Sequence, residues 1–279
     1  MSLNTKILQI YYKPEQLETL DPAFTLYDNT DNPNPAIQEW LIWDKMYQEF
    51  VDQGVDRWGF VSWKFRDKMG ISGQVALDFI DANPGHDVYL FNPAILNEAV
   101  WANGWEQGDY WHPGLADIAD EFLQRTNTVD SDYLVKEMML DRTRMGFATY
   151  FVATRKFWDG YMDLSRKIFT LAEQDPEFNQ KVFGEGGSGY NLNKSLPMFP
   201  FLNERLVGTF MDLNDLDVCT YTHTANTLPE KYKPYIAEIS ALSDLKMAVN
   251  YYESDQIYNA WNQLRQAFLI RNNGVLNIE

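Results

Sequence analysis

A glutamate and an arginine, Glu204 and Arg205, stand side by side in an otherwise apolar stretch, residues 199–211. At about 100° per residue, a helix through this stretch carries apolar side chains both on the face of Leu206 and on the far side, near Met211. A helix that is apolar almost all round is expected to be buried. Burying a carboxylate and a guanidinium is costly unless they pair or meet a ligand. The pair is therefore either a structural ion pair or part of a site, and the residue types alone favour neither.

A second chemical pattern is the aromatic stretch from Trp101 to Leu115. Large aromatic residues alternate there with amides, carboxylates and a histidine, in a stretch too rich in glycine to favour a helix. Such a mixture suits a sugar-binding cleft, because rings stack on C–H faces and polar groups bind hydroxyls. The competing interpretation is a packed loop whose tryptophans close the edge of a sheet.

The hydrophobic pattern indicates strands alternating with helices up to about residue 225, and helices alone after it. It predicts an α/β domain, residues 1–225, with a mostly parallel central sheet flanked by helices. A helical C-terminal extension, residues 226–279, is expected to pack on it. We expect strands over 7–12, 58–65, 87–92, 147–153 and 218–222, and helices over 36–50, 73–82, 115–124, 132–139, 155–173, 199–211, 236–250 and 255–271.

In a parallel sheet, ligands bind beyond the carboxyl ends of the strands. The residues at these ends are therefore candidates for a functional site. They are Tyr11, Tyr12 and Lys13 after the first strand, Trp63, Lys64 and Arg66 around the end of the second, and Asn92 at the end of the third.

Several familiar chemistries find no support in the sequence. The glycine-rich stretch Gly184–Gly189 lacks the lysine of a P-loop and the setting of a dinucleotide fingerprint, so we expect a mobile loop or a lid over a ligand. The three histidines are far apart, and Cys219 is the only cysteine. Asp215 and Asp217 have a metal-binding spacing but precede their strand. No metal site can be named from these residues.

The composition narrows the classes of partner. The chain has 279 residues, 45% of them hydrophobic, and its 23 basic and 40 acidic residues give a formal net charge of −17. A chain this acidic repels nucleic acid and anionic membrane surfaces, although a local patch leaves peripheral membrane contact open. No apolar run is long enough for a membrane span, and the N-terminus lacks the apolar core of a secretory signal. We therefore expect a cytoplasmic protein.

Four segments, taken in order, resemble a family of bacterial surface-polysaccharide glycosyltransferases, the capsular and lipopolysaccharide type with a GT-A-like nucleotide-sugar fold. Asp28–Pro35 followed by Glu39–Trp43 is similar to the family's acidic, Asn-rich loop and Glu-bearing aromatic helix. Trp58–Phe65 is similar to its aromatic strand that ends in basic residues. Phe147–Tyr161 resembles its strand-then-helix segment, and Phe199–Leu206 resembles its Phe/Ser-Glu-Arg-Leu helix.

The resemblance spans roughly residues 5–225 and leaves out the helical tail. The chain departs from the family at Ser62-Trp63-Lys64, where family members often carry His-Tyr-Arg. It also lacks an identifiable Asp-x-Asp motif, which leaves dependence on a divalent cation, Mg²⁺ or Mn²⁺, open.

The resemblance implies transfer of a sugar from a nucleotide-diphosphate donor to a surface-glycan or lipid-linked acceptor. Such chemistry needs a cation or basic side chains near the departing diphosphate, and a carboxylate base if the anomeric centre inverts. The implied catalytic candidates are Glu204 or Asp87 as the base, with Arg205 beside Glu204. The implied donor-binding residues are Tyr11, Lys13, Glu39, Lys64, Arg66 and Asn92, and the implied acceptor-binding residues are Trp105, Glu106 and His112.

Two other classes stay open. One is a non-catalytic carbohydrate-binding protein that retains the transferase fold. The other is a glycoside hydrolase, for which two specific catalytic carboxylates cannot be selected from the sequence.

Overall fold

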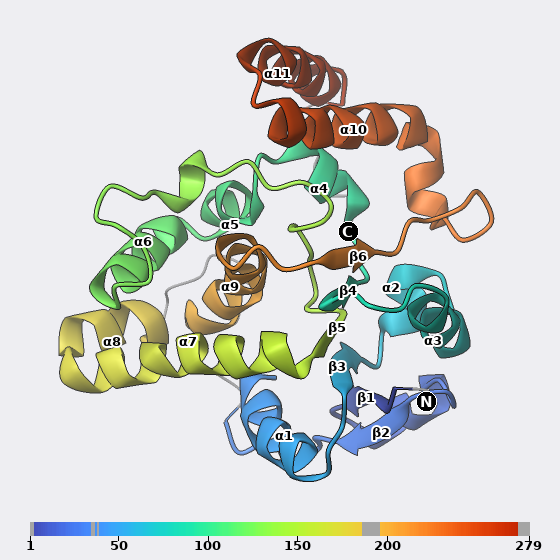
Figure 1. Ribbon diagram of the computed structural model, residues 1–279, viewed down its shortest axis with the longest axis vertical. Helices are drawn as coiled ribbons and strands as arrows, with labels where there is room; N and C mark the ends of the chain where they lie inside the picture. Colours follow the sequence, from blue (N-terminus) through green and yellow to red (C-terminus); the bar gives the residue numbers. More distant parts are fainter. Residues whose placement is uncertain (1–2, 35–36, 38, 186–195, 273–279) are drawn as a thin grey trace.

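The computed structural model describes residues 3–34, 37, 39–185 and 196–272. Within these residues six strands form one sheet, in the order β2-β1-β3-β5-β4-β6, with helices around it (Figure 1). The expected α/β class is confirmed, although β2 was not expected. The strands are β1 (Thr5–Tyr11), β2 (Thr25–Asp28), β3 (Arg57–Ser62), β4 (Val88–Leu90), β5 (Phe151–Thr154) and β6 (Val218–Thr220).

The sheet is mixed, so the expectation of a mostly parallel sheet is wrong. β1 pairs in parallel with both β2 and β3, and β4 pairs in parallel with β6. β5, however, lies between β3 and β4 and runs antiparallel to both. The sequence does not reveal this reversal, because a short apolar run looks the same in either direction. As a result, the residues before β5 lie at the edge of the sheet where β1 and β3 end.

Most expected helices are present with small shifts at their ends. Ser72 caps α3, since its side chain accepts a hydrogen bond from the N–H of Val75. The helix expected over 132–139 is only a 3-10 turn, Val135–Glu137, whereas α2, α4, α5 and α8 were not expected. The helices are α1 (Trp40–Asp52), α2 (Phe65–Met69), α3 (Gly73–Ala82), α4 (Ile95–Val100), α5 (Gly104–Trp111), α6 (Leu115–Arg125), α7 (Arg155–Gln174), α8 (Pro176–Phe183), α9 (Phe199–Leu213), α10 (Ile236–Tyr252) and α11 (Asp255–Arg271).

Successive side chains along a strand point to opposite faces of the sheet, and they belong to two separate hydrophobic cores. Phe60 of β3 and Phe151 of β5 belong to the larger core, which also takes in side chains of α1 and α5 to α9. Val61 and Val152, the next residues along, pack on the other face with side chains of α2 and α3. Figure 1 shows these two groups of helices on opposite sides of the sheet.

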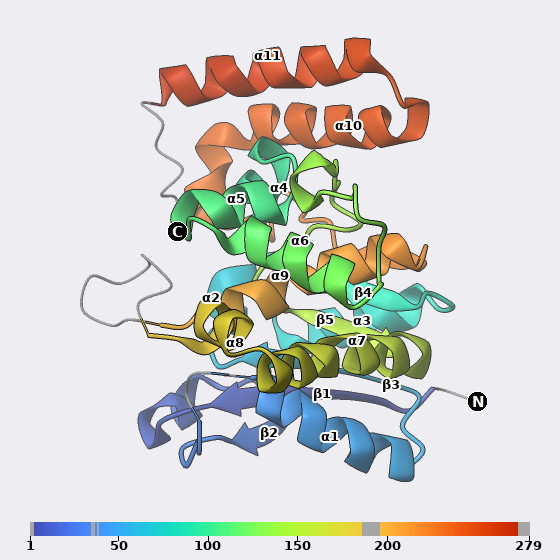
Figure 2. The ribbon, with the colours of Figure 1, turned by 90° about the vertical axis from the view of Figure 1, so that its left-hand side faces the viewer.

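The C-terminal helices α10 and α11 share a third core with α4, which includes Trp261 and Phe268. Figure 2 shows the two helices stacked at the end of the molecule farthest from β1 and β2. The side chain of Lys246 in α10 is fully buried beneath them and donates to the carbonyl oxygens of Glu98 and Trp101, at 2.5 and 2.8 Å. A buried cation therefore joins the helical C-terminus to the rest of the protein. None of the described helices is long and apolar enough to cross a membrane.

Candidate functional site

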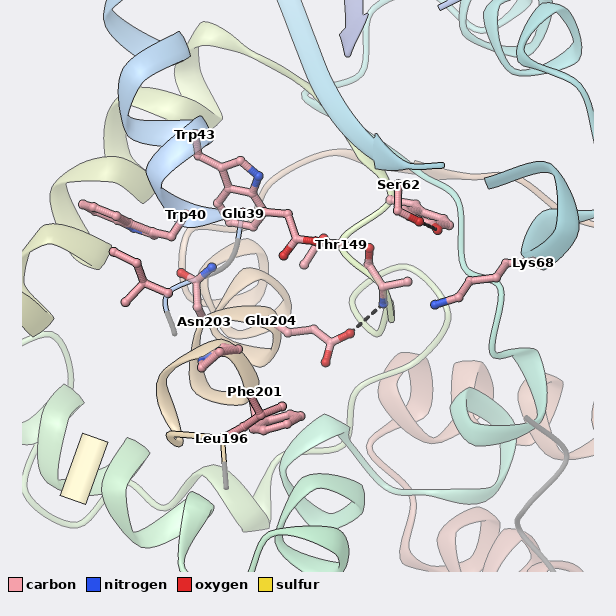
Figure 3. Close-up of a pocket in the computed structure, with 14 residues that line it drawn as sticks. Glu39, Trp40, Trp43, Ser62, Lys68, Thr149, Leu196, Phe201, Asn203 and Glu204 are labelled. Atoms are coloured by element: carbon pink, nitrogen blue, oxygen red, sulfur yellow. Dashed lines mark hydrogen bonds between the residues drawn. The ribbon is translucent and has the colours of Figure 1, made fainter. Parts of the chain in front are cut away.

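A pocket of about 260 Å³ lies at the edge of the sheet where β3 ends and β5 is about to begin. Figure 3 shows the side chains of Glu39, Lys68 and Glu204 directed toward the same space from three separate parts of the chain. Its polar lining also includes the hydroxyl-bearing residues Ser62, Thr149 and Tyr150, and Asn203. The apolar lining includes the rings of Trp40, Trp43 and Phe201.

Glu204 enters the pocket from α9, a helix that is buried on almost every side, as the sequence predicts. Its Oε1 accepts a hydrogen bond of 2.6 Å from the backbone N–H of Ala148. Its Oε2 accepts a longer hydrogen bond, 3.3 Å, from Nη1 of Arg205. Both oxygens of this carboxylate are therefore already engaged by the protein.

Glu39 stands immediately before α1 and reaches the pocket from its other side. Its Oε1 accepts a hydrogen bond of 2.6 Å from the hydroxyl of Tyr12, which follows β1. Burial, together with the Glu39 carboxylate, raises the pKa of Tyr12, so the phenol stays protonated and keeps donating. Oε2 of Glu39 accepts no hydrogen bond from any described residue. One oxygen of Glu39 is thus available to a ligand.

Lys68 brings a positive charge to the pocket from α2. Its ammonium nitrogen lies 5.9 Å from the ring centroid of Tyr150 and makes no ion pair within the described chain. Lys13, Lys64 and Arg66, the cations expected at this edge, follow β1 and β3 but do not line the pocket. They too form no ion pair with a described residue. The edge of an acidic protein therefore carries four uncompensated cations, of which Lys68 is the one inside the pocket.

The turn before β5 has an unusual backbone. Ala148 and Thr149 have φ values of 64° and 55°, in the left-handed region that residues with a Cβ avoid. A β-branched residue such as Thr149 is a clear outlier there, and each such residue costs on the order of 1–3 kcal/mol. The hydroxyl of Thr149 donates to the carbonyl of Ala148 at 2.7 Å, and Tyr150, next along, shares a 2.5 Å hydrogen bond with Ser62.

Arg205 points away from the pocket and into the protein. Its Nε donates to the carbonyl of Gly104 at 2.8 Å, and its Nη2 donates to the side chain of Gln107 at 2.5 Å. Both partners belong to α5, and the glycines of that helix leave room for the guanidinium. A Cβ on Gly108 would overlap Nε of Arg205 and lie 2.8 Å from its Cδ. The aromatic stretch is thus a helix whose glycines admit Arg205, and the expectation that they prevent a helix is wrong.

Three other residues expected in a site lie outside the pocket. Asp87 precedes β4, at the opposite edge of the sheet, and its carboxylate pairs with Lys156 at 2.7 Å. Asn92 is buried. Its side-chain amide donates to the carbonyl of Met145 and accepts from the N–H of Ala94. Tyr11 interacts with Asp28, whose hydrogen bond raises the pKa of the phenol.

The three residues expected to bind an acceptor do not line the pocket. Trp105 is fully buried, and its indole N–H donates to Thr209 at 2.8 Å. The two oxygens of Glu106 accept from the Ala102 N–H and from Arg265 of α11. The ring of His112 stacks on Phe201 with centroids 3.7 Å apart, so His112 supports a pocket wall from behind. The burial of Trp105 agrees with the competing interpretation of residues 101–115, in which the tryptophans are packed inside the protein.

The pocket contains functional candidates that the sequence does not single out. Lys68 follows Lys64 by one helical turn, and that spacing was an available signal. Thr149 and Tyr150 precede their strand, and only the reversed direction of β5 brings them here. Among the described residues no group of three or more His, Cys, Asp or Glu side chains could hold a metal ion. The glycine-rich stretch expected as a lid, from residue 186 onward, lies outside the described residues.

Comparison of the chain with protein-family models, with curated proteins and with solved structures gave no match. The functional argument therefore depends on the pocket and on its chemistry.

Proposed function

We propose that the protein is a glycosyltransferase that moves a sugar from a nucleotide-diphosphate donor to a surface-glycan or lipid-linked acceptor. The resemblance to the GT-A-like family is part of this proposal, as is a cytoplasmic location. The observation that supports it most is that Lys68, Glu39 and Glu204 line the same pocket. Transfer from a diphosphate needs positive charge near the leaving group and a carboxylate near the attacking hydroxyl.

The electrostatics of this edge support an anionic donor. The whole chain carries a formal net charge of −17, yet Lys13, Lys64, Arg66 and Lys68 gather where β1 and β3 end. None of these four has an ion-pair partner among the described residues. Uncompensated cations at the rim of a concave site concentrate anions there. We assign Lys68 to the diphosphate and the other three to attraction of the donor.

The aromatic lining supports a sugar as the transferred group. Trp40, Trp43 and Phe201 give the pocket apolar faces, and Thr149 and Tyr150 give it hydroxyls. Aromatic faces with a few polar groups are what sugar rings need, because a sugar has both C–H faces and hydroxyls. Trp43 contributes only its ring to this lining, because its indole N–H is buried and meets no acceptor among the described residues.

A second candidate function is non-catalytic carbohydrate binding on the same fold. The specific observation in its favour is the charge of the lining, two carboxylates against one ammonium group. Such a lining suits hydroxyl-rich neutral glycans as well as a transfer reaction. The two functions differ in whether the nucleotide part of a donor is recognised.

A thermal-shift panel separates these functions. The purified protein is heated with UDP-, GDP- and CMP-sugars, each with and without Mg²⁺ or Mn²⁺, and with free mono- and oligosaccharides. A ligand that binds only the folded state raises the unfolding midpoint. The transferase proposal requires a rise with at least one nucleotide sugar. A rise with free glycans alone would instead assign the pocket to carbohydrate binding.

A further inference from the structure

The two carboxylates of the pocket are held in different ways. Glu204 has both oxygens engaged, by the Ala148 N–H at 2.6 Å and by Arg205 at 3.3 Å. Glu39 has one oxygen engaged, by the Tyr12 hydroxyl at 2.6 Å, and one that no described residue contacts through a hydrogen bond. The protein therefore holds Glu204 through both oxygens, whereas Glu39 keeps one oxygen for a ligand.

The shorter of the two hydrogen bonds to Glu204 comes from the strained turn. Ala148, with φ 64°, donates its N–H to Glu204, and Thr149, with φ 55°, follows it. Left-handed conformations of residues other than glycine persist only where the surroundings hold them. The next residue, Tyr150, is anchored by its bond to Ser62. Glu204 is therefore placed to hold the turn at its strained end.

We propose that Glu204 is a positioning residue, a latch that keeps the Ala148–Thr149 turn left-handed, and that Glu39 is the carboxylate that contacts the substrate. This division of labour rests on the proposed transferase function. In the transfer step the acceptor hydroxyl gives its proton to Oε2 of Glu39, and its oxygen forms the bond to the anomeric carbon. The bond from that carbon to the diphosphate oxygen breaks, and the electron pair leaves with the diphosphate beside Lys68.

The latch is tested by stability, without any assay of activity. Ala148→Gly removes the backbone strain at residue 148 and leaves that at Thr149, because glycine adopts positive φ freely. We expect it to raise the unfolding midpoint of the otherwise unchanged protein by about 2 °C or more. In Glu204→Ala protein the turn has already relaxed, so the same change should add little or nothing. Equal rises in both backgrounds, or no rise in either, would overturn the latch.

The division of labour is tested with two isosteric amides in the full chain. Glu39→Gln should keep the unfolding midpoint and the affinity for the nucleotide sugar, and should lower turnover at least 100-fold. Glu204→Gln keeps an acceptor for the Ala148 N–H and should lower turnover by no more than tenfold. Glu204→Ala should raise KM, and adding Ala148→Gly should restore part of the loss, because glycine reaches the left-handed conformation at residue 148 without strain.

The opposite pattern would contradict the assignment. If Glu204→Gln abolishes turnover at an unchanged midpoint while Glu39→Gln stays active, Glu204 is the catalytic carboxylate. If the unmodified protein neither binds nor turns over any nucleotide sugar, the proposed function fails and the role of Glu39 fails with it. The latch is then still decided by the stability comparison of Ala148→Gly in the two backgrounds.

Discussion

The guanidinium of Arg205 lies against Gly108, at a point where α5 has no side chain to keep α9 away. A Cβ on Gly108 would lie 2.8 Å from Cδ of Arg205 and 2.8 Å from a methyl group of Leu115. Arg205 cannot easily withdraw, because it is buried and bonded to the carbonyl of Gly104. The glycine and the arginine are therefore one packing unit, and it lies directly behind Glu204.

Gly108→Ala is expected to destabilise the protein by about 2–3 kcal/mol, because the added methyl group must displace a buried, hydrogen-bonded arginine. Gly104→Ala is the matched control in the same helix, since its Cβ would lie 3.3 Å from Cγ of Arg205 and needs only a small shift. We expect its effect to stay below about 1 kcal/mol, helped by the better helix propensity of alanine. Denaturant unfolding measures both, and similar losses would contradict the packing argument.

His112 makes stability depend on pH. Burial, with the nearby Arg205 charge, lowers the pKa of His112 to about 4, against an ordinary value near 6.5. As the pH falls below 6.5 the unfolded chain takes up a proton that the folded chain refuses until about pH 4. The free energy of unfolding should therefore drop across this interval by up to about 3 kcal/mol.

His112→Phe provides the comparison, because phenylalanine keeps a ring against Phe201 without a titrating group. We expect the unfolding free energies of the two proteins to converge or cross as the pH is lowered from 7 to 4.5. Parallel curves over that range would show that His112 is not the group responsible.

We expect removal of the Lys246 charge to lower the free energy of unfolding more than removal of any other buried charge. It is fully buried and lies 3.5 Å from the carboxylate of Glu98, which is itself buried. Lys246→Met leaves that carboxylate without its cation, and we expect a loss of about 3–5 kcal/mol in chemical unfolding. Adding Glu98→Gln should recover part of it. Lys167→Met, which breaks an exposed pair with Asp163, is the control and should cost less than about 1 kcal/mol.

Much of the fold could be predicted from the sequence, because its elements are set by local patterns. The apolar helix around Glu204, the Ser72 cap and the two C-terminal helices follow from periodicity and capping. The direction of β5 does not follow from such local patterns, since it depends on which strands β5 pairs with. That one reversal changes which flanking residues reach the pocket.

The site could be predicted only in part for the same reason. Glu39 and Glu204 are both named from the sequence, and the structure brings them to one pocket although 165 residues separate them (204 − 39). Arg205 shares the helix of Glu204, but one position further turns it by about 100° and into the protein. Lys68 could be found only by extending the argument one helical turn beyond Lys64, into a helix that the sequence analysis does not predict.

The most direct test of the account is the affinity of the pocket for a nucleotide sugar with and without Lys68. Calorimetric titration of the unmodified protein should detect at least one nucleotide sugar, and Lys68→Gln should weaken that binding about tenfold, or ~1.4 kcal/mol. Lys167→Gln, with a lysine outside the pocket, should bind as tightly as the unmodified protein. The account is contradicted if no nucleotide sugar binds the unmodified protein, or if Lys68→Gln binds it equally well.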